Sequence, residues 1–247
     1  MKFPRKLVTR EKGAQLVSGG VVYPYPSDAR DYPFHLTPIY QPDKWQHKAR
    51  YGNAPMFLSS GEWTVHGRMT LSKESLKMTG EGYHTVLKAS SSNSEGIFHI
   101  TANAVGIKNV QFNMNGRPGK AIEIADSVAS VSIQNCVFVG LTNAYGIFGD
   151  NADRVTIENC YFVGGANDVI YVLDSNEVAI RNNRIIPGSG VEINLASTTA
   201  GTVGDQSNFG IVSGNHVGVG SIRYNTTATS GNHQISGNNA NATLVTY

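Results

Sequence analysis

The chain has 247 residues and a formal net charge of +2 at pH 7, and only 15% of its residues are charged, against about 25% in ordinary soluble domains. A chain of this length can bury a sizeable core in one large domain, and its weak net charge predicts no general attraction to nucleic acid or to an anionic membrane. No apolar run approaches the length of a membrane span, so membrane insertion is not expected.

Residues 1–53 do not repeat, and we expect them to form an N-terminal arm that attaches the protein and wraps the rest or a neighbouring subunit. Five basic residues and one acidic residue lie within the first twelve, which fits either a solvated arm or one that docks on an acidic partner. No apolar segment follows these charges, so no secretory signal is predicted. The tract Tyr23–Pro42 contains five prolines, which exclude a regular helix or a central strand.

The pattern changes at Ala54, where Met56–Leu58 and Gly61–His66 predict the first strands and the cap of a second segment, 54–247. At the other end of that segment, Ala242–Tyr247 offers no polar or helical cap. An uncapped solenoid end exposes unpaired strand edges, so we expect another chain to cover the C-terminal coil.

A ten-residue phrase within this segment appears twice, as Val131–Gly140 and again 24 residues later as Val155–Gly164. The same frame continues upstream in Val105–Phe112 and downstream in Val178–Ile185. A period in the twenties is typical of a solenoid, in which each coil packs on the one before.

One column of the repeat holds residues that tolerate a positive φ, which predicts a left-handed bend between two short strands. The column consists of Asn109, Asn135, Asn159, Asn182, Gly214 and Gly237, spaced by 26, 24, 23, 32 and 23 residues. Apolar residues alternate with polar ones before each bend, as in a strand with one buried face. A second inward column follows the bend, formed by Phe112, Phe138, Phe162, Ile185 and Val217. The sequence therefore predicts an all-β fold, a right-handed single-stranded parallel β-helix with coils of about 23–26 residues.

Two other folds fit less well. Amphipathic helices would need apolar residues at helical spacing, which the sequence lacks, and a β-sandwich would need tight two-residue hairpin turns, which are not evident.

Cys136 and Cys160 share one column on adjacent coils. Their side chains should run parallel, which favours two buried free thiols over a disulfide.

The segment Ser75–Leu87 resembles the opening coil of the pectate-lyase-like β-helix superfamily, and the resemblance extends over Ala54–Tyr247. That superfamily includes polysaccharide lyases, glycosidases and bacteriophage tailspikes, so the resemblance implies a fold more firmly than an activity. Arg181–Pro187 is the segment nearest to the lyase arginine signature, but it lacks the internal proline and the family's order of residues.

Hydrolysis of a glycosidic bond would need a carboxylate pair, for which Glu123, Asp168 and Glu192 are the candidates. Glu123 and Glu192 each lie between apolar residues and should point outward. Other aspartates, including Asp126, Asp150 and Asp174, come just before new strands, where aspartate is a common turn residue. No histidine spacing indicates a metal site, and no cofactor is expected.

An outward column two places after the bend offers a second surface, for glycan binding or for subunit contact. Its polar and aromatic members are Tyr161, Arg184, His216 and Asn239. Glu158 and Arg181 share the outward column before the bend, where we expect an ion pair.

The first functional hypothesis is a virion protein similar to phage tailspikes and tail fibres, made in the host cytoplasm. Its arm would bind other virion proteins, its coils would form a homotrimer, and its surface would bind a cell-surface polysaccharide or pack within the virion. The second hypothesis is an enzyme that degrades capsule or a uronate-containing polymer.

Overall fold

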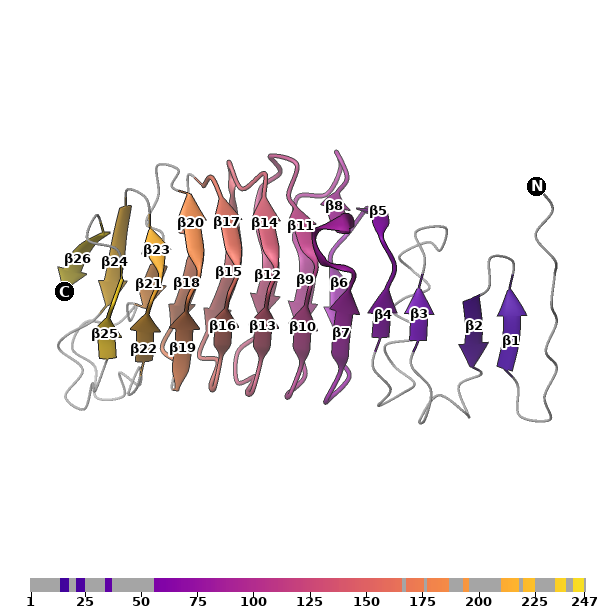
Figure 1. Ribbon diagram of the computed structural model, residues 1–247, viewed down its shortest axis with the longest axis horizontal. Helices are drawn as coiled ribbons and strands as arrows, with labels where there is room; N and C mark the ends of the chain where they lie inside the picture. Colours follow the sequence, from indigo (N-terminus) through magenta and orange to yellow (C-terminus); the bar gives the residue numbers. More distant parts are fainter. Residues whose placement is uncertain are drawn as a thin grey trace.

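The computed structural model describes residues 56–165, 168–175, 177–186, 193–195, 210–217, 220–224, 234–238 and 242–246, together with three strands within 1–53. Nearly all of its strands belong to three parallel sheets that run along the molecule (Figure 1). The one antiparallel pair among the described strands joins β1 (Ala14–Val17) to β2 (Val21–Pro24). A short 3₁₀ turn, η1 (Gly82–His84), lies before β8. The fold is a right-handed parallel β-helix, as the sequence predicts.

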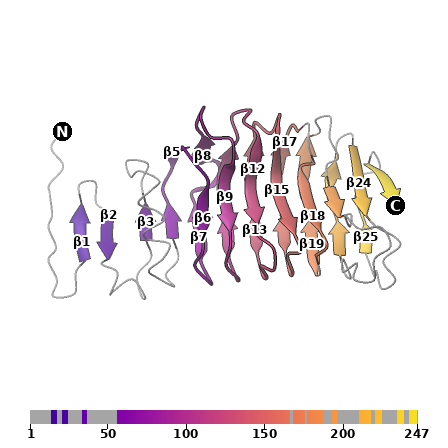
Figure 2. The same ribbon diagram turned by 180° about the vertical axis from the view of Figure 1, so that it is seen from behind.

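The strands of each coil fall into the three sheets in turn. The first sheet contains β3 (Phe34–Leu36), β4 (Met56–Leu58), β7 (Lys77–Gly80), β10 (Gly106–Lys108), β13 (Ser132–Gln134), β16 (Thr156–Glu158), β19 (Val178–Arg181), β22 (Gly210–Ser213) and β25 (Gln234–Ser236). The second contains β5 (Gly61–Val65), β8 (Thr85–Ala89), β11 (Gln111–Asn113), β14 (Val137–Val139), β17 (Tyr161–Val163), β20 (Arg184–Ile186) and β23 (His216–Val217). The third, seen from behind in Figure 2, contains β6 (Met69–Leu71), β9 (Gly96–Ile100), β12 (Gly119–Ile124), β15 (Ala144–Asp150), β18 (Ile170–Leu173), β21 (Ile193–Leu195), β24 (Gly220–Tyr224) and β26 (Ala242–Thr246).

The predicted bend between the first and second sheets is confirmed. The residues at the bend have φ values of +58° at Asn109, +52° at Asn135 and +54° at both Asn159 and Asn182. At the C-terminal end of the column the residue at the bend is glycine, with φ of +65° at Gly214 and +62° at Gly237. Asparagine and glycine pay the smallest steric penalty for this conformation, which explains why the column holds these two residue types.

Substitution at Asn159 tests this account, because its side chain is exposed and its backbone alone should decide the result. We expect Asn159→Val to lower the free energy of unfolding by about 1–2 kcal/mol, the cost of a left-handed backbone for a residue with a branched Cβ. Asn159→Gly should change it by only a few tenths of that amount. Urea unfolding followed by circular dichroism measures both, and equal stability of the two variants would contradict the account.

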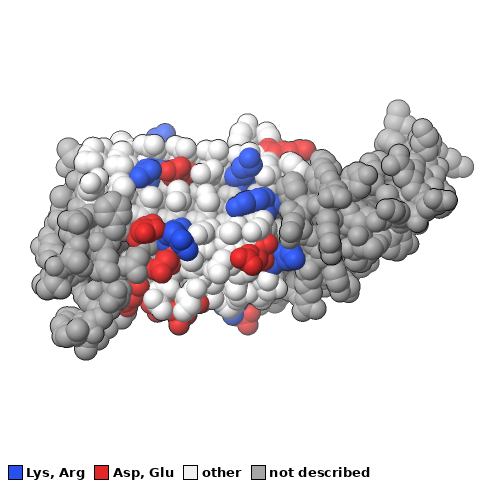
Figure 3. Space-filling model, turned by 90° about the horizontal axis from the view of Figure 1, so that it is seen from below, with Lys and Arg blue, Asp and Glu red and all other residues white. Residues whose placement is uncertain are grey.

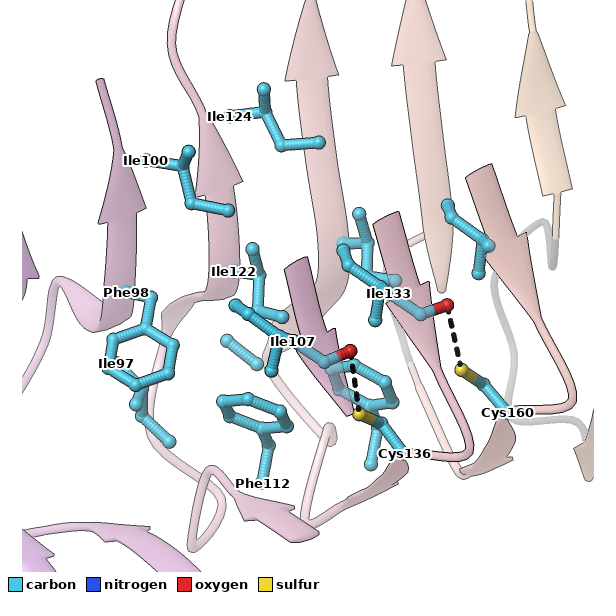
Figure 4. Close-up of a cluster of buried hydrophobic side chains, with 14 of the residues drawn as sticks. Ile97, Phe98, Ile100, Ile107, Phe112, Ile122, Ile124, Ile133, Cys136 and Cys160 are labelled. Atoms are coloured by element: carbon cyan, nitrogen blue, oxygen red, sulfur yellow. Dashed lines mark hydrogen bonds between the residues drawn. The ribbon is translucent and has the colours of Figure 1, made fainter. Parts of the chain in front are cut away.

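Aromatic stacking along the core is also confirmed. Phe112 and Phe138 stack with ring centroids 5.0 Å apart, and Phe138 and Phe162 stack at 4.6 Å. Phe98 closes the N-terminal end of the column by an edge contact with Phe112 at 5.5 Å. All four rings are fully buried, and Figure 4 shows Phe98 and Phe112 among isoleucines of the first and third sheets. The column continues as Ile185 and Val217 on the next coils.

The two cysteines are free and buried, as the sequence predicts. The Cys136 thiol lies 3.9 Å from the carbonyl oxygen of Ile107, and that of Cys160 lies 3.6 Å from the carbonyl oxygen of Ile133 (Figure 4). Burial, and then the neighbouring Cys136, raise the pKa of the Cys160 thiol, so it stays protonated at neutral pH.

The column that holds the cysteines turns into an amide ladder on the following coils. On the earlier coils this position holds a buried apolar residue or a thiol, and on the later coils it holds the buried side chains of Asn183 and Asn215. The Asn215 carboxamide donates to the Ile180 carbonyl at 2.9 Å and accepts from the backbone N–H of Asn183 at 2.9 Å. Asn238 repeats the pattern one coil on, donating to Val212 and accepting from the Asn215 backbone. Each carboxamide therefore ties its own coil to the one before.

Candidate functional site

A β-bulge that recurs on successive coils shapes the outer face of the third sheet. In β15 the backbone N–H groups of Gly146 and Ile147 both donate to the carbonyl of Val169, at 3.0 Å each. Gly146 and Ile147 are both buried, so two consecutive residues face inward. The same pair of inward residues occurs at Ala121 and Ile122 in β12. Strict alternation therefore fails here, and outward residues lie three apart instead of two.

Glycine is required at the bulge of β15. A Cβ at Gly146 would lie 2.7 Å from the Val169 carbonyl oxygen and 3.1 Å from the ring of Phe162. The backbone of one coil thus passes close to the next, which no larger residue allows without a shift.

The bulge creates two outward columns on the third sheet. The first runs through Lys120 and Tyr145, which are register partners, and reaches Asp168 two residues before Ile170. The second column contains His99, Glu123, Phe148 and Tyr171 on consecutive coils. We call these seven residues, together with Arg68, the third-sheet strip.

Glu123 is the centre of an ionic cluster in the strip. Lys120 Nζ lies 2.6 Å from one carboxylate oxygen, and Arg68 Nη1 pairs with the other. Burial by itself would raise the pKa of Glu123, but the hydrogen bond and charge of Lys120 and the charge of Arg68 outweigh it and lower the pKa. Glu123 therefore stays ionised at neutral pH. Burial, and then the charge of Arg68, lower the pKa of His99, which is consequently neutral there.

Three aromatic rings lie beside this cluster. Phe148 and Tyr171 stack with centroids 5.1 Å apart and planes 16° apart. Tyr145 meets Phe148 edge to face, with ring centroids 5.5 Å apart. It meets Tyr171 at a tilt of 57°, with ring centroids 5.7 Å apart. Lys120 Nζ stands 3.9 Å from the centre of the Phe148 ring, so one ammonium contacts both Glu123 and an aromatic face. All three rings are partly exposed on the outer face of the sheet.

Carboxylates gather where the strands of the third sheet end. Burial, followed by the charges of Asp174 and Asp126, raises the pKa of Asp150. Asn151 donates its amide to Asp126 in the same group. Figure 3 shows charged side chains on one face of the molecule in mixed groups of both signs, with uncharged surface between them.

Two of the three predicted carboxylates belong to the strip. Glu123 faces outward as predicted, and Asp168 lies two coils on, in the other column. With a rise of about 4.8 Å per coil and about 3.3 Å per residue, their Cα atoms are about 14 Å apart. Glu192 lies outside the described residues.

The stripe predicted on the second sheet is present in register. Tyr161, Arg184 and His216 face outward on consecutive coils, and the Arg184 guanidinium lies 5.6 Å from the centre of the Tyr161 ring. Asn239, the last member of the predicted stripe, lies outside the described residues. The ion pair expected on the first sheet is present, with Arg181 Nη1 3.6 Å from Glu158.

Sequence reasoning did not single out Arg68, His99, Lys120, Tyr145, Phe148 or Tyr171 as site residues. The signal was present in the run of two apolar residues between Lys120 and Glu123, which indicates a bulge once β12 and β15 are aligned. Among the described residues no group of histidine, cysteine, aspartate and glutamate could hold a metal ion. Within the same residues no helix has the length and apolarity of a membrane span.

Comparison with solved structures finds the same fold in proteins of different kinds. The catalytic domain of a GH87 alpha-1,3-glucanase, in complex with tetrasaccharides, matches with a TM-score of 0.61 at 20% identity, over 85% of this chain and 45% of that one. The same kind of domain in complex with nigerose gives 0.58 at 21% identity, over 77% and 37%. ORF18 of Geobacillus virus E2 gives 0.50 at 9% identity, over 86% and 60%. The chain thus spans less than half the length of these glucanase domains.

A search of the sequence against proteins of curated function finds no match. A family model described as the right-handed beta helix region matches residues 95–247. This match covers more than half of the chain and includes β9 to β26, the strands that carry most of the third-sheet strip. The protein therefore belongs to the right-handed β-helix family.

Proposed function

We propose that the chain is a glycan-binding β-helix and that the third-sheet strip is its binding surface. The observation that carries the proposal is the cluster of Tyr145, Phe148 and Tyr171 next to the ionic group of Lys120 and Glu123. Sugars present apolar C–H faces that pack on aromatic rings and hydroxyl groups that bond to charged side chains. The strip supplies both kinds of contact within a few coils of one rigid sheet.

The wider setting that we propose is a virion, in which the segment 1–53 attaches the protein and the β-helix presents the strip to a cell-surface polysaccharide. The likeness of the fold to two kinds of protein and one strand pairing in the arm support this setting. The fold is shared with a Geobacillus virus protein and with glucanase domains solved with bound oligosaccharides. In the arm, β3 pairs in parallel with β4 and so adds a strand to the first sheet.

Binding to polysaccharides tests the proposal, with the second sheet as an internal control. We expect Tyr145→Ala to weaken binding about tenfold, because it removes one aromatic contact worth about 1.4 kcal/mol. Tyr161→Ala, on the second sheet, should leave the affinity unchanged. Isothermal titration calorimetry against glycans selected from a polysaccharide panel measures both variants. The reverse order of effects would place the binding surface on the second sheet.

The second sheet is better suited to subunit contact. Its outer face carries Val137, Val139, Tyr161 and Val163 on two consecutive coils, followed by Ile186, which is 38% exposed. Tyrosine with surrounding aliphatic residues is typical of interface centres. We propose that this face packs in a homotrimer. Sedimentation equilibrium at micromolar concentration should give three times the 26.5 kDa chain mass, and a monomer would refute the trimer.

An enzyme that cleaves a polysaccharide is the alternative function. The observation in its favour is the group of neighbouring carboxylates Asp126, Asp150 and Asp174 at the ends of the third-sheet strands, where partial burial and then the charges of Asp174 and Asp126 raise the pKa of Asp150, the direction that a proton donor needs. Such an enzyme would release reducing ends from the polymer that it binds, and Asp150→Asn would abolish the release without abolishing binding. If the protein binds a glycan but releases no reducing ends, the enzyme alternative is refuted and the glycan-binding function remains.

A further inference from the structure

One corner of the β-helix holds the only Asn-Gly pair in the chain. Asn115 and Gly116 lie in the turn between β11 and β12, and the Asn115 side chain is exposed. A glycine after asparagine leaves its backbone nitrogen unhindered by a Cβ, so this nitrogen can attack the side-chain carbonyl carbon of the asparagine. The pair is therefore the place in the sequence where an asparagine most easily loses its amide nitrogen without an enzyme.

This reaction consumes one water molecule and releases one ammonia. The Gly116 nitrogen gives up its proton and bonds to Cγ of Asn115, and the carboxamide nitrogen leaves with that proton as ammonia. Water then opens the cyclic imide at either carbonyl, which gives aspartate or isoaspartate. The reaction thus needs a Gly116 N–H that can lose its proton and an Asn115 carboxamide that can approach the Gly116 nitrogen.

The fold ties these two groups to different coils. The Gly116 N–H donates to the carbonyl of Gly140 at 3.0 Å, on the coil that follows. The Asn115 carboxamide donates to the carbonyl of Ala89 at 3.4 Å, on the coil before. The first bond holds the proton that must leave, and the second holds the nitrogen that must leave. Both bonds must therefore break before the imide can form.

Further contacts fix the same turn. The Asn113 side-chain oxygen accepts from the Asn115 N–H at 2.8 Å, and the Asn143 carboxamide donates to the Gly116 carbonyl at 3.3 Å. Gly140 lies close against the turn, since a Cβ there would be 2.7 Å from the backbone nitrogen of Asn115 and 2.8 Å from the Asn113 side-chain oxygen. The turn is thus held by the coils on both sides and is released only by local opening.

We infer that Asn115 is a self-modification site of this chain and that the contacts of its turn with the neighbouring coils control the reaction. Asn115 converts to aspartate or isoaspartate only in molecules whose turn has opened, so the folded protein reacts more slowly than the unfolded chain. The product carries one additional negative charge at the corner before β12, the strand of Lys120 and Glu123. The inference is independent of glycan binding.

Mass spectrometry of the tryptic peptide 109–120, after incubation at mildly alkaline pH, measures the reaction. The chain unfolded in urea should react at Asn115 at least about tenfold faster than the folded protein. Gly140→Ala should accelerate the reaction of the folded protein severalfold, because the new Cβ displaces the turn. Gly164→Ala is the matched control, because Gly164 occupies the same position one coil on and has a similar φ of +74°, but nothing lies within 4 Å of its Cβ position. This control should leave the rate unchanged.

Asn143→Ala is a milder variant that removes only the bond to the Gly116 carbonyl, and it should raise the rate less than Gly140→Ala does. Four results would overturn the inference. A folded protein that reacts as fast as the unfolded chain would show that the contacts do not control the reaction. Equal acceleration in the two glycine variants would assign it to global stability, and no acceleration in Gly140→Ala or Asn143→Ala would separate it from this turn. An unfolded chain that keeps its Asn115 carboxamide would remove the site itself.

Discussion

Replacing Phe138 by alanine should lower the free energy of unfolding by about 3–5 kcal/mol, the cost of truncating a fully buried aromatic ring. Phe138 lies in the middle of the aromatic column, 5.0 Å from Phe112 and 4.6 Å from Phe162 between ring centroids. A cavity at this place would remove contacts from two coils at once. Because β-sheets on three sides fix the backbone, the neighbouring rings can close little of the cavity.

Urea unfolding followed by circular dichroism measures the change, with Phe138→Leu as the matched control. Leucine keeps most of the volume, so it should cost less than half as much as alanine. Phe148→Ala provides a second comparison, because that ring stacks just as closely but on the outer face, where water replaces the lost contacts. A Phe138→Ala variant no less stable than Phe148→Ala would contradict a core built around the column.

Replacing Asn215 by alanine should cost about 3–5 kcal/mol as well, although the side chain that is removed is polar. The substitution leaves the buried backbone N–H of Asn183 without its acceptor and removes the carboxamide donor from the carbonyl of Ile180. Each buried group left without a partner costs about 1–3 kcal/mol. The lost contact between the Asn215 and Asn238 carboxamides, at 3.0 Å, adds to that cost.

Asn143 is the control for this prediction. Its carboxamide also donates to the backbone of the preceding coil, at Gly116, but it is exposed and water can replace the bond. Asn143→Ala should therefore change the unfolding free energy by about 0.5 kcal/mol or less. Comparable losses in the two variants, measured by the same urea titration, would show that burial of the ladder contributes nothing.

The coil itself could be predicted from the sequence because its signals are local and repeated. Asn135 and Asn159 mark the bend by their tolerance of a positive φ, and Phe138 and Phe162 mark the core by recurring three residues later. Each signal depends on the backbone and on the pattern within a coil. Stacking then follows, since equivalent residues of parallel coils lie one strand spacing apart.

The strip and the ladder could not be predicted in the same way. Lys120 reaches Glu123 and Phe148 because the bulge turns two consecutive residues inward, and strict alternation would have placed Lys120 on the wrong side. Asn183 and Asn215 are polar residues at inward positions, where a search for apolar columns passes over them. Their burial is favourable only because the next coil supplies the partner for each amide.

The core changes its chemistry along the axis, since the stacked rings end at Phe162 and the carboxamides begin at Asn183 on the next coil. Apolar contacts weaken on cooling and in solvents that dissolve hydrocarbon, whereas amide hydrogen bonds do not share that dependence. The C-terminal coils keep buried aliphatic residues, among them Ile185 and Val212, and add the carboxamide bonds to them, so on cooling they should lose less of their stability than the coils that hold only the stacked rings.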